Sequence, residues 1–175
     1  MERIIIVGTS GSGKTTLART LANRINGSHI EIDALFHLPD WKETPDEEML
    51  ARLDELTNAE RWTTCGNYRK FLIPIALPKA DTIVWLDYNL AFVLARLLRR
   101  TFRRLLRREE LWNGNRESWR MFFSRESIFL WALKSHYANR PVYSKLFAHE
   151  TDRLIHLRSP LETKQWLNSI TSDLD

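Results

Sequence analysis

The 175-residue chain carries 26 lysines and arginines against 22 acidic residues, a net charge of +4, and 43% of its residues are hydrophobic. This length suits one α/β domain, residues 1–175, and no apolar run is long enough to span a membrane. The only cysteine, Cys65, excludes a disulfide within the chain and fits a cytoplasmic protein, and the first strand begins too early to leave room for a signal peptide.

The first predicted element is the β-branched run at residues 3–7, which is apolar on both faces and therefore typical of a central strand in a parallel sheet. The sequence G-T-S-G-S-G-K-T follows at residues 8–15 and fits the phosphate-binding pattern G-x-x-x-x-G-K-[ST] at every fixed position. Glycines let successive N–H groups point at one anion, and the helix predicted from Lys14 to about residue 26 adds the positive end of its dipole.

This loop predicts a site for a nucleoside triphosphate, ATP, with Mg²⁺. We expect Lys14 to reach the β- and γ-phosphates and the Thr15 hydroxyl to ligate Mg²⁺. The expected nucleotide contacts are Gly8, Thr9, Ser10, Gly11, Ser12, Gly13, Lys14, Thr15 and Thr16.

Further strands are predicted at residues 28–33, 62–66, 82–87 and 153–157, and helices at residues 45–59, 89–108, 117–137, 142–149 and 160–170. Strands that alternate with helices indicate parallel βαβ units, whose ligands bind at the carboxyl ends of the strands. The phosphate-binding loop, Asp33, Arg69 and Asp87 are therefore expected along one edge of the sheet.

Two carboxylates end the second predicted strand. Glu31 and Asp33 are two residues apart, so on a strand their side chains share a face. Asp33 is a candidate base or positioning group for an acceptor hydroxyl, with Glu31 beside it. The alternative is a solvated strand end, where acidic residues are common.

Asp87 and Arg69 follow two other strands and allow two interpretations each. Asp87 is either a carboxylate of the magnesium site or a cap for the helix that begins near Asn89. Arg69 is either a bidentate ligand for a phosphate or carboxylate of the second substrate or an ordinary surface arginine.

A strongly basic segment follows, with ten arginines and three glutamates between residues 96 and 125, a net charge of +7. On a helix, residues 96, 99, 100, 103, 104, 107 and 108 form one arginine face, and Leu97, Leu98, Phe102, Leu105 and Leu106 are expected to form the opposite, docking face. Repeated arginine without lysine favours phosphate recognition, either of ATP or of a nucleic-acid backbone.

The chain resembles the adenylate-kinase-like P-loop phosphotransferases. It is more closely similar to small bacterial DNA topology modulation proteins, which are related to adenylate kinases. The segments that carry the resemblance are the phosphate-binding loop, H-I-E-I-D-A-L-F-H, W-K-E-T-P, G-N-Y-R, R-E-E-L-W-N-G-N-R-E-S and S-R-E-S-I-F-L-W-A.

The resemblance implies a three-layer P-loop fold with a five-stranded parallel sheet in the order 2-3-1-4-5, an acceptor-side segment near residues 34–60 and an arginine-rich helical lid near residues 96–140. It also implies that Arg69 contacts the acceptor, that the lid residues Arg116, Arg120 and Arg125 are catalytic and that Arg158 flanks the adenine. In one departure from the pattern, Cys65 stands where adenylate kinases have an aspartate, and a neutral thiol is a poor partner for Mg²⁺.

Two hypotheses follow. The first is an ATP- and Mg²⁺-dependent phosphotransferase for a small-molecule acceptor, with Lys14 and Asp33 among its catalytic residues. The second is a nucleic-acid-associated P-loop ATPase or a regulatory nucleotide-binding protein. The first is favoured because no aromatic stacking platform interleaves the arginines.

Overall fold

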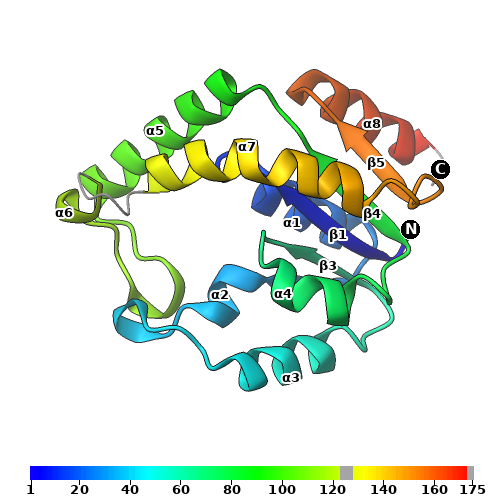
Figure 1. Cartoon of the computed structure of the whole chain (residues 1–175), viewed down its shortest axis with the longest axis horizontal. Coiled ribbons are helices and arrows are strands. Elements are labelled where there is room, and N and C mark those ends of the chain that lie inside the picture. The colour runs from blue at the N-terminus through cyan, green and yellow to red at the C-terminus, as the bar shows by residue number, and fades with distance from the viewer. Residues whose placement is uncertain (123–127, 173–175) are drawn as a thin grey trace.

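The computed structural model describes residues 1–122 and 128–172. Its strands are β1 (Arg3–Gly8), β2 (Ser28–Glu31), β3 (Trp62–Cys65), β4 (Thr82–Leu86) and β5 (Leu154–Leu157). Its longer helices are α1 (Lys14–Arg24), α3 (Asp46–Leu56), α5 (Leu90–Arg107), α7 (Ile128–Leu146) and α8 (Pro160–Ser172). Shorter helical segments are α2 (Ile32–Phe36), η1 (Pro39–Trp41), α4 (Arg69–Phe71), η2 (Leu72–Ala76), η3 (Trp112–Gly114) and α6 (Trp119–Phe122). Figure 1 shows their arrangement.

All five strands are parallel and lie in the order β2-β3-β1-β4-β5, so the predicted fold class and strand order are confirmed. The central strand β1 pairs Ile5 with Thr64 of β3 on one side and with Ile83 of β4 on the other. The phosphate-binding loop that follows β1 therefore leaves the middle of the sheet at its carboxyl edge, where ligands of such sheets bind.

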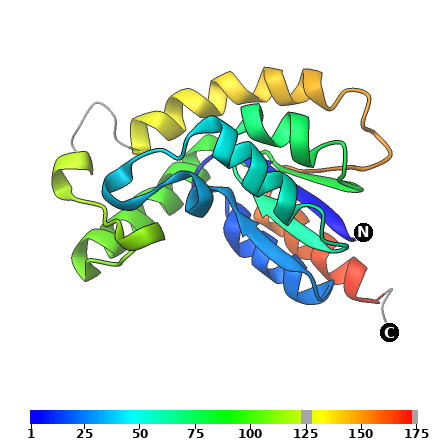
Figure 2. The same ribbon diagram turned by 90° about the horizontal axis from the view of Figure 1, so that it is seen from below.

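Both faces of the sheet are covered, because alternate residues of β1 enter two different cores. Ile5 and Val7 belong to a core that includes residues of α3, η2 and α7, whereas Ile4 and Ile6 belong to a core shared with α1 and partly buried residues of α8. Figure 2 shows α7 on one side of the sheet and α1 and α8 on the other. The result is the expected three-layer architecture.

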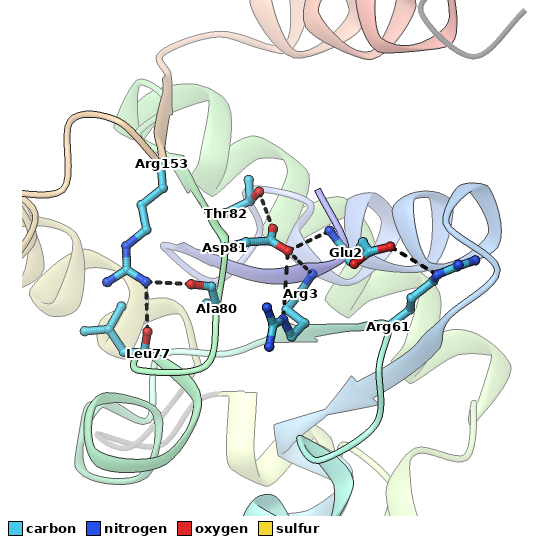
Figure 3. Close-up of polar contacts among 8 residues, drawn as sticks. All are labelled: Glu2, Arg3, Arg61, Leu77, Ala80, Asp81, Thr82 and Arg153. Carbon is cyan, nitrogen blue, oxygen red and sulfur yellow. Dashed lines mark hydrogen bonds and ion pairs between the residues drawn. The ribbon is translucent and has the colours of Figure 1, made fainter.

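The amino edge of the sheet is fastened by side chains that bind backbone groups (Figure 3). The Asp81 carboxylate accepts hydrogen bonds from the backbone N–H groups of Glu2 (2.9 Å) and Arg3 (3.0 Å) and from the Thr82 hydroxyl (2.7 Å). Arg153, just before β5, donates to the carbonyl oxygens of residues 77 (3.1 Å) and 80 (2.6 Å). These contacts join the starts of β1, β4 and β5 at the edge opposite the phosphate-binding loop.

Two predicted boundaries are wrong. Strand β2 ends at Glu31 and Asp33 lies in the first turn of α2, so the two carboxylates do not share a strand face. The helix predicted at residues 117–137 includes residues 123–127, which lie outside the described residues, and on either side of them the structure has α6 and α7. The helix predicted at residues 142–149 is not a separate element, because α7 continues through Pro141. A proline inside a helix removes one backbone hydrogen bond. Here the helix continues because Ala132, His136 and Tyr143 are buried on both sides of the proline.

The predicted division of α5 into an apolar and an arginine face is also partly wrong. The buried residues are Val93, Leu97, Thr101 and Leu105, which recur every four residues. Phe102 and Leu106 are 42% and 75% exposed, so they do not dock the helix as expected. At 100° per residue, Leu106 falls among the arginines and away from the buried stripe.

Candidate active site

The phosphate-binding loop, residues 8–15, connects β1 to α1 and requires glycine where it passes other backbone segments. A Cβ on Gly8 (φ +146°) would lie 2.5 Å from the Leu86 carbonyl oxygen, and one on Gly11 (φ +91°) would lie 2.8 Å from the Val93 carbonyl oxygen. Only glycine fits such close approaches at positive φ. The loop is thereby held between the end of β4 and the start of α5.

Lys14 lies inside this loop. Its ammonium group donates to the carbonyl oxygens of Gly8 (2.6 Å) and Thr9 (3.1 Å). Burial lowers the pKa of Lys14 from 10.5 to about 8, although the nearby Asp33 carboxylate opposes the shift. A desolvated ammonium at the start of a helix is a strong binding site for a phosphate oxygen.

The rest of the loop presents polar groups in the same region. Ser10, Gly11, Gly13, Thr15 and Thr16 line the cleft, whereas Gly8, Thr9 and Ser12 are not part of its lining. The Ser12 hydroxyl oxygen is buried without a hydrogen-bond partner among the described residues. An unpaired buried hydroxyl of this kind is consistent with a loop built to receive a further polar group.

The Thr15 hydroxyl faces one carboxylate and one thiol. It donates to Glu31 at 3.4 Å, and the Cys65 thiol donates to it at 3.7 Å. Glu31, at the end of β2, is also paired with Arg19 at 3.0 Å. Burial raises the pKa of the Cys65 thiol from 9.0 to about 11, so this residue stays neutral. Thr15 and Glu31 therefore present neighbouring oxygen atoms of the hard kind that Mg²⁺ prefers.

Asp87 lies outside the lining of the cleft. Its side chain is 5% exposed and pairs with Arg140 of α7 at 2.8 Å and with His156 of β5 at 3.1 Å. The Asn89 side chain, not Asp87, accepts from the N–H of Ala91 and caps α5. The alternative prediction that Asp87 caps this helix is therefore wrong, and its carboxylate instead joins α7 to the sheet.

Asp33 reaches the cleft from α2. Its Oδ1 accepts a hydrogen bond from the Tyr68 hydroxyl at 2.8 Å, and that hydroxyl also lies 3.3 Å from Nε2 of His37. Burial, followed by the charge of Asp33, raises the pKa of Tyr68 far above its ordinary value. Neither Tyr68 nor His37 was identified from the sequence as a site residue, although Tyr68 stands within the G-N-Y-R turn.

Arg69 and Arg158 occupy different surroundings. Arg69 opens α4 and lines the cleft, and its guanidinium makes no hydrogen bond or ion pair with any residue that the structure describes. Arg158 is exposed and lies outside the cleft lining, at the start of α8. Its backbone N–H donates to Glu162 at 2.7 Å, and Ser159 caps the same helix. The predicted roles of both arginines stay predictions.

Helix α5 supplies five of the arginines that line the cleft, namely Arg96, Arg99, Arg100, Arg103 and Arg104. Arg96 donates to the Ser12 carbonyl oxygen at 3.4 Å, so the helix contacts the phosphate-binding loop directly. Arg100 makes no hydrogen bond or ion pair within the described part of the chain, and its Nε is buried. Burial, followed by the charge of Arg104, lowers the pKa of Arg100 from 12.5 to about 10.

Of the three arginines predicted as catalytic, the structure describes Arg116 and Arg120. Arg116 is exposed and pairs with Glu110 at 3.3 Å, and neither Arg116 nor Arg120 lines the cleft in this structure. Arg125 lies outside the described residues. The sequence pattern pointed to the lid loop, whereas the structure brings the α5 arginines to the phosphate-binding loop.

The loop between α5 and α6 reaches across to the segment after α2, as Figure 1 shows. The Asn113 amide donates to the carbonyl oxygens of Ala34 (3.1 Å) and His37 (2.6 Å). The buried Asn115 amide donates to the Leu38 carbonyl (2.9 Å) and accepts from the N–H of Trp41 (2.9 Å). The cleft is therefore bounded by both segments, with a volume of about 2320 Å³.

Comparison of the sequence with protein-family models and with curated proteins gives no match. Among solved structures, the chain is similar to shikimate kinase from Bacteroides thetaiotaomicron, with a TM-score of 0.57 and 14% identity over 99% of this chain and 98% of that one. It is also similar to a gluconokinase from Sinorhizobium meliloti, with a TM-score of 0.53 and 18% identity over 99% and 95% of the two chains. The chain thus has the fold of these P-loop kinases.

Proposed function

We propose that the protein is an ATP- and Mg²⁺-dependent phosphotransferase that acts on a small molecule. The observation that carries this proposal is the common cleft of Lys14, Asp33 and the α5 arginines. Phosphoryl transfer needs cations around the transferring group and a positioned acceptor more than it needs covalent chemistry from the protein. The fold shared with two small-molecule kinases supports the proposal.

We assign nucleotide binding to the phosphate-binding loop. When bound, ATP supplies the phosphoryl group and Mg²⁺ neutralises charge on its phosphates. The loop N–H groups and Lys14 would bind the phosphate oxygens, and the Thr15 hydroxyl with Glu31 would hold the metal or its water. Among the described residues no group of three His, Cys, Asp or Glu side chains gathers as a metal site. Mg²⁺ does not require such a group, because phosphates and water complete its shell.

We assign the acceptor to the side formed by residues 34–60 together with Asp33 and Arg69, and the lid to residues 96–140. Arg96 and Arg100 of α5 are best placed to stabilise the transferring phosphoryl group, because both line the cleft beside the loop. We also propose a cytoplasmic location, where a free thiol such as Cys65 stays reduced. No helix in the described ranges is long and apolar enough to cross a membrane.

One observation favours a nucleic-acid-associated ATPase as the second candidate. Arg99, Arg103, Arg107 and Arg108 are exposed on α5, beside the exposed Phe102. Basic and aromatic side chains together bind single-stranded nucleic acids. This candidate ranks second because Arg103 is paired with Glu109 at 3.0 Å and Phe102 packs on Trp119 of α6. The similarity to DNA topology modulation proteins stays a prediction.

The test is ADP release from ATP·Mg²⁺ with a panel of acceptors, comprising shikimate, gluconate, adenosine and AMP, and separately with duplex and single-stranded DNA. We expect a small-molecule acceptor to stimulate turnover and DNA not to do so. The control is Lys14→Ala, which should abolish turnover while its circular dichroism spectrum is unchanged. Stimulation by DNA alone would favour the second candidate.

A further inference from the structure

Three side chains from two segments form a continuous hydrogen-bonded row at the acceptor side of the cleft. They are His37, Tyr68 and Asp33, joined at 3.3 Å and 2.8 Å. His37 directly follows α2, and Tyr68 lies in the turn between β3 and α4. The row places two side chains with no assigned role behind Asp33, the candidate proton acceptor.

The chemistry of the three groups determines which one donates and which one accepts in each hydrogen bond of the row. An ionised carboxylate only accepts, so the Tyr68 hydroxyl must donate its proton to Asp33. The Tyr68 oxygen is then free to accept, and His37 must donate to it from Nε2–H. Burial lowers the pKa of His37, although the Asp33 and Glu43 carboxylates oppose the shift, so the ring is neutral at neutral pH. Nδ1 of His37 is buried and has no partner among the described residues, as expected for the unprotonated nitrogen.

Aromatic packing holds the row in place. The His37 ring stacks on Trp112, with ring centroids 5.8 Å apart, and makes an edge contact with Trp41 at 5.3 Å. The Tyr68 ring packs against Phe36 at 4.7 Å. Because these rings cannot turn freely, the Tyr68 hydroxyl presents a fixed donor to Oδ1 of Asp33. Oδ2 of Asp33 makes no hydrogen bond to any residue within the described ranges, and Asp33 lines the cleft.

We propose that Tyr68, oriented by His37, is a positioning residue that holds Asp33 as the proton acceptor for an alcohol. The second substrate of this cleft then reacts through a hydroxyl oxygen and not through a phosphate oxygen. The proposal rests on the proposed phosphotransferase function. In the reaction, the acceptor oxygen forms a bond to the γ-phosphorus of ATP while the bond from that phosphorus to the β–γ bridging oxygen breaks. The hydroxyl proton passes to Oδ2 of Asp33, ADP leaves, and the proton is later released to water.

The negative charge of the Asp33 carboxylate distinguishes an alcohol acceptor from a phosphate acceptor. An alcohol brings a proton that a carboxylate can accept, whereas a phosphate acceptor at neutral pH brings negative charge that the carboxylate repels. Lys14 and Arg100 are the cations whose electrostatic contact with Asp33 balances its charge.

The kinetic test compares Tyr68→Phe with Tyr88→Phe. Tyr88 is a matched control, since its hydroxyl bonds Thr163 at 2.6 Å and it lies outside the cleft lining. Tyr68→Phe should lower kcat by up to roughly 100-fold with ATP affinity unchanged, because misplacing a reacting group has an effect of that order. His37→Ala should lower kcat similarly, and His37→Gln, which retains a donor near Nε2, should restore most of it. Equal kcat in Tyr68→Phe and wild type would overturn the proposal.

The acceptor class is tested with ATP labelled at the γ-phosphate. Transfer of label to adenosine or another alcohol of the panel supports the proposal. Transfer of label from ATP into ADP, with AMP as acceptor and at a higher rate than to any alcohol, overturns it.

A measurement independent of activity is ¹⁵N NMR of histidine-labelled protein without ligands, with the His37 signal assigned through His37→Gln. The expected result is the neutral Nε2–H tautomer at neutral pH. A charged ring, or the Nδ1–H tautomer, overturns the proposal. If the protein instead binds no ATP while His37 shows the expected tautomer, the proposed phosphotransferase function is wrong. The hydrogen bonds from His37 through Tyr68 to Asp33 are supported in that case.

Discussion

The hydroxyl group of Thr9 in the phosphate-binding loop lies 3.1 Å from Nδ1 of His136 on α7, and both residues are buried. One turn further along α7, Arg140 pairs with Asp87 at the end of β4. Helix α7, which begins within the proposed lid segment, is thus bonded both to the loop and to the residue that follows the neighbouring strand. A change in the position of α7 must therefore alter the surroundings of the phosphate-binding loop.

The lowered pKa of Lys14 predicts that ATP binding depends on pH. Burial disfavours the charged ammonium, so its pKa is about 8 and not 10.5. The ammonium is fully present below about pH 8 and is lost above it, while the triphosphate stays ionised. ATP affinity should therefore fall by up to roughly tenfold per pH unit above about 8. Calorimetric titration of ATP into the protein at several pH values checks this. Lys14→Ala should bind ATP weakly, with an affinity that does not fall above about pH 8. A flat wild-type profile would contradict the prediction.

The α5 arginines should contribute more to catalysis than the lid-loop arginines. Arg100 lines the cleft without a partner among the described residues, whereas Arg116 is exposed and paired with Glu110. Arg100→Gln should lower kcat roughly 100-fold or more, the effect expected for a lost group that stabilises developing charge. Arg116→Gln should change kcat little, because exposed ion pairs contribute little. Steady-state kinetics measures kcat for both variants. A larger loss of kcat in Arg116→Gln than in Arg100→Gln would support the lid-loop arginines, as predicted from the sequence.

The magnesium site should depend on Glu31. Glu31 lies next to the Thr15 hydroxyl, so Glu31→Gln should raise the Mg²⁺ concentration needed for half-maximal turnover. Asp87→Asn is the comparison, because Asp87 is the carboxylate predicted from the sequence. Its buried charge is bound to Arg140 and His156, so this variant should lower the melting temperature instead. A Mg²⁺ shift in Asp87→Asn but not in Glu31→Gln would assign the metal to Asp87.

The only thiol of the chain should be unreactive in the folded protein. Cys65 is 1% exposed, and burial raises its pKa to about 11, so almost no thiolate is present at neutral pH. A chromogenic disulfide reagent should therefore label the protein only after denaturation, and then with one equivalent per chain. Fast labelling of the native protein would show that this position opens to solvent.

The contact between the lid loop and the acceptor side should stabilise the closed cleft. Asn115→Ala removes bonds to the backbone of Leu38 and Trp41. Since the lost bonds hold two segments together and do not touch the phosphate-binding loop, KM for the acceptor should rise several-fold more than KM for ATP. Asn58→Ala is the control, because Asn58 lies outside the cleft lining and its side chain accepts a hydrogen bond from Lys79. Equal effects on both KM values would indicate a general loss of stability.

Sequence patterns predicted the phosphate-binding loop and the alternation of strands and helices, because these features depend on residues close together in the chain. The phosphate-binding loop follows from residues 8–15, and the alternation of strands and helices predicts a parallel sheet. The order of the strands was implied by the resemblance to adenylate-kinase-like proteins, and the structure confirms this order. The row from His37 through Tyr68 to Asp33 was not predictable, because the turn after β3 approaches α2 only in the folded chain. The predicted docking face of α5 was partly wrong for a different reason, since periodicity gives the faces of a helix but not the neighbour that each face meets. The catalytic roles of Arg116, Arg120 and Arg125 stay predictions.

The central position of β1 has a consequence for biosynthesis. On the ribosome this strand, with its five buried residues 4–8, emerges before its two neighbours. Its partner strands begin only at residues 62 and 82. At typical elongation rates of about 5–20 residues per second, the strand waits on the order of seconds before both of its edges are paired. The nascent chain therefore exposes its most apolar strand through much of translation, and chaperones that bind extended apolar segments are expected to engage it there.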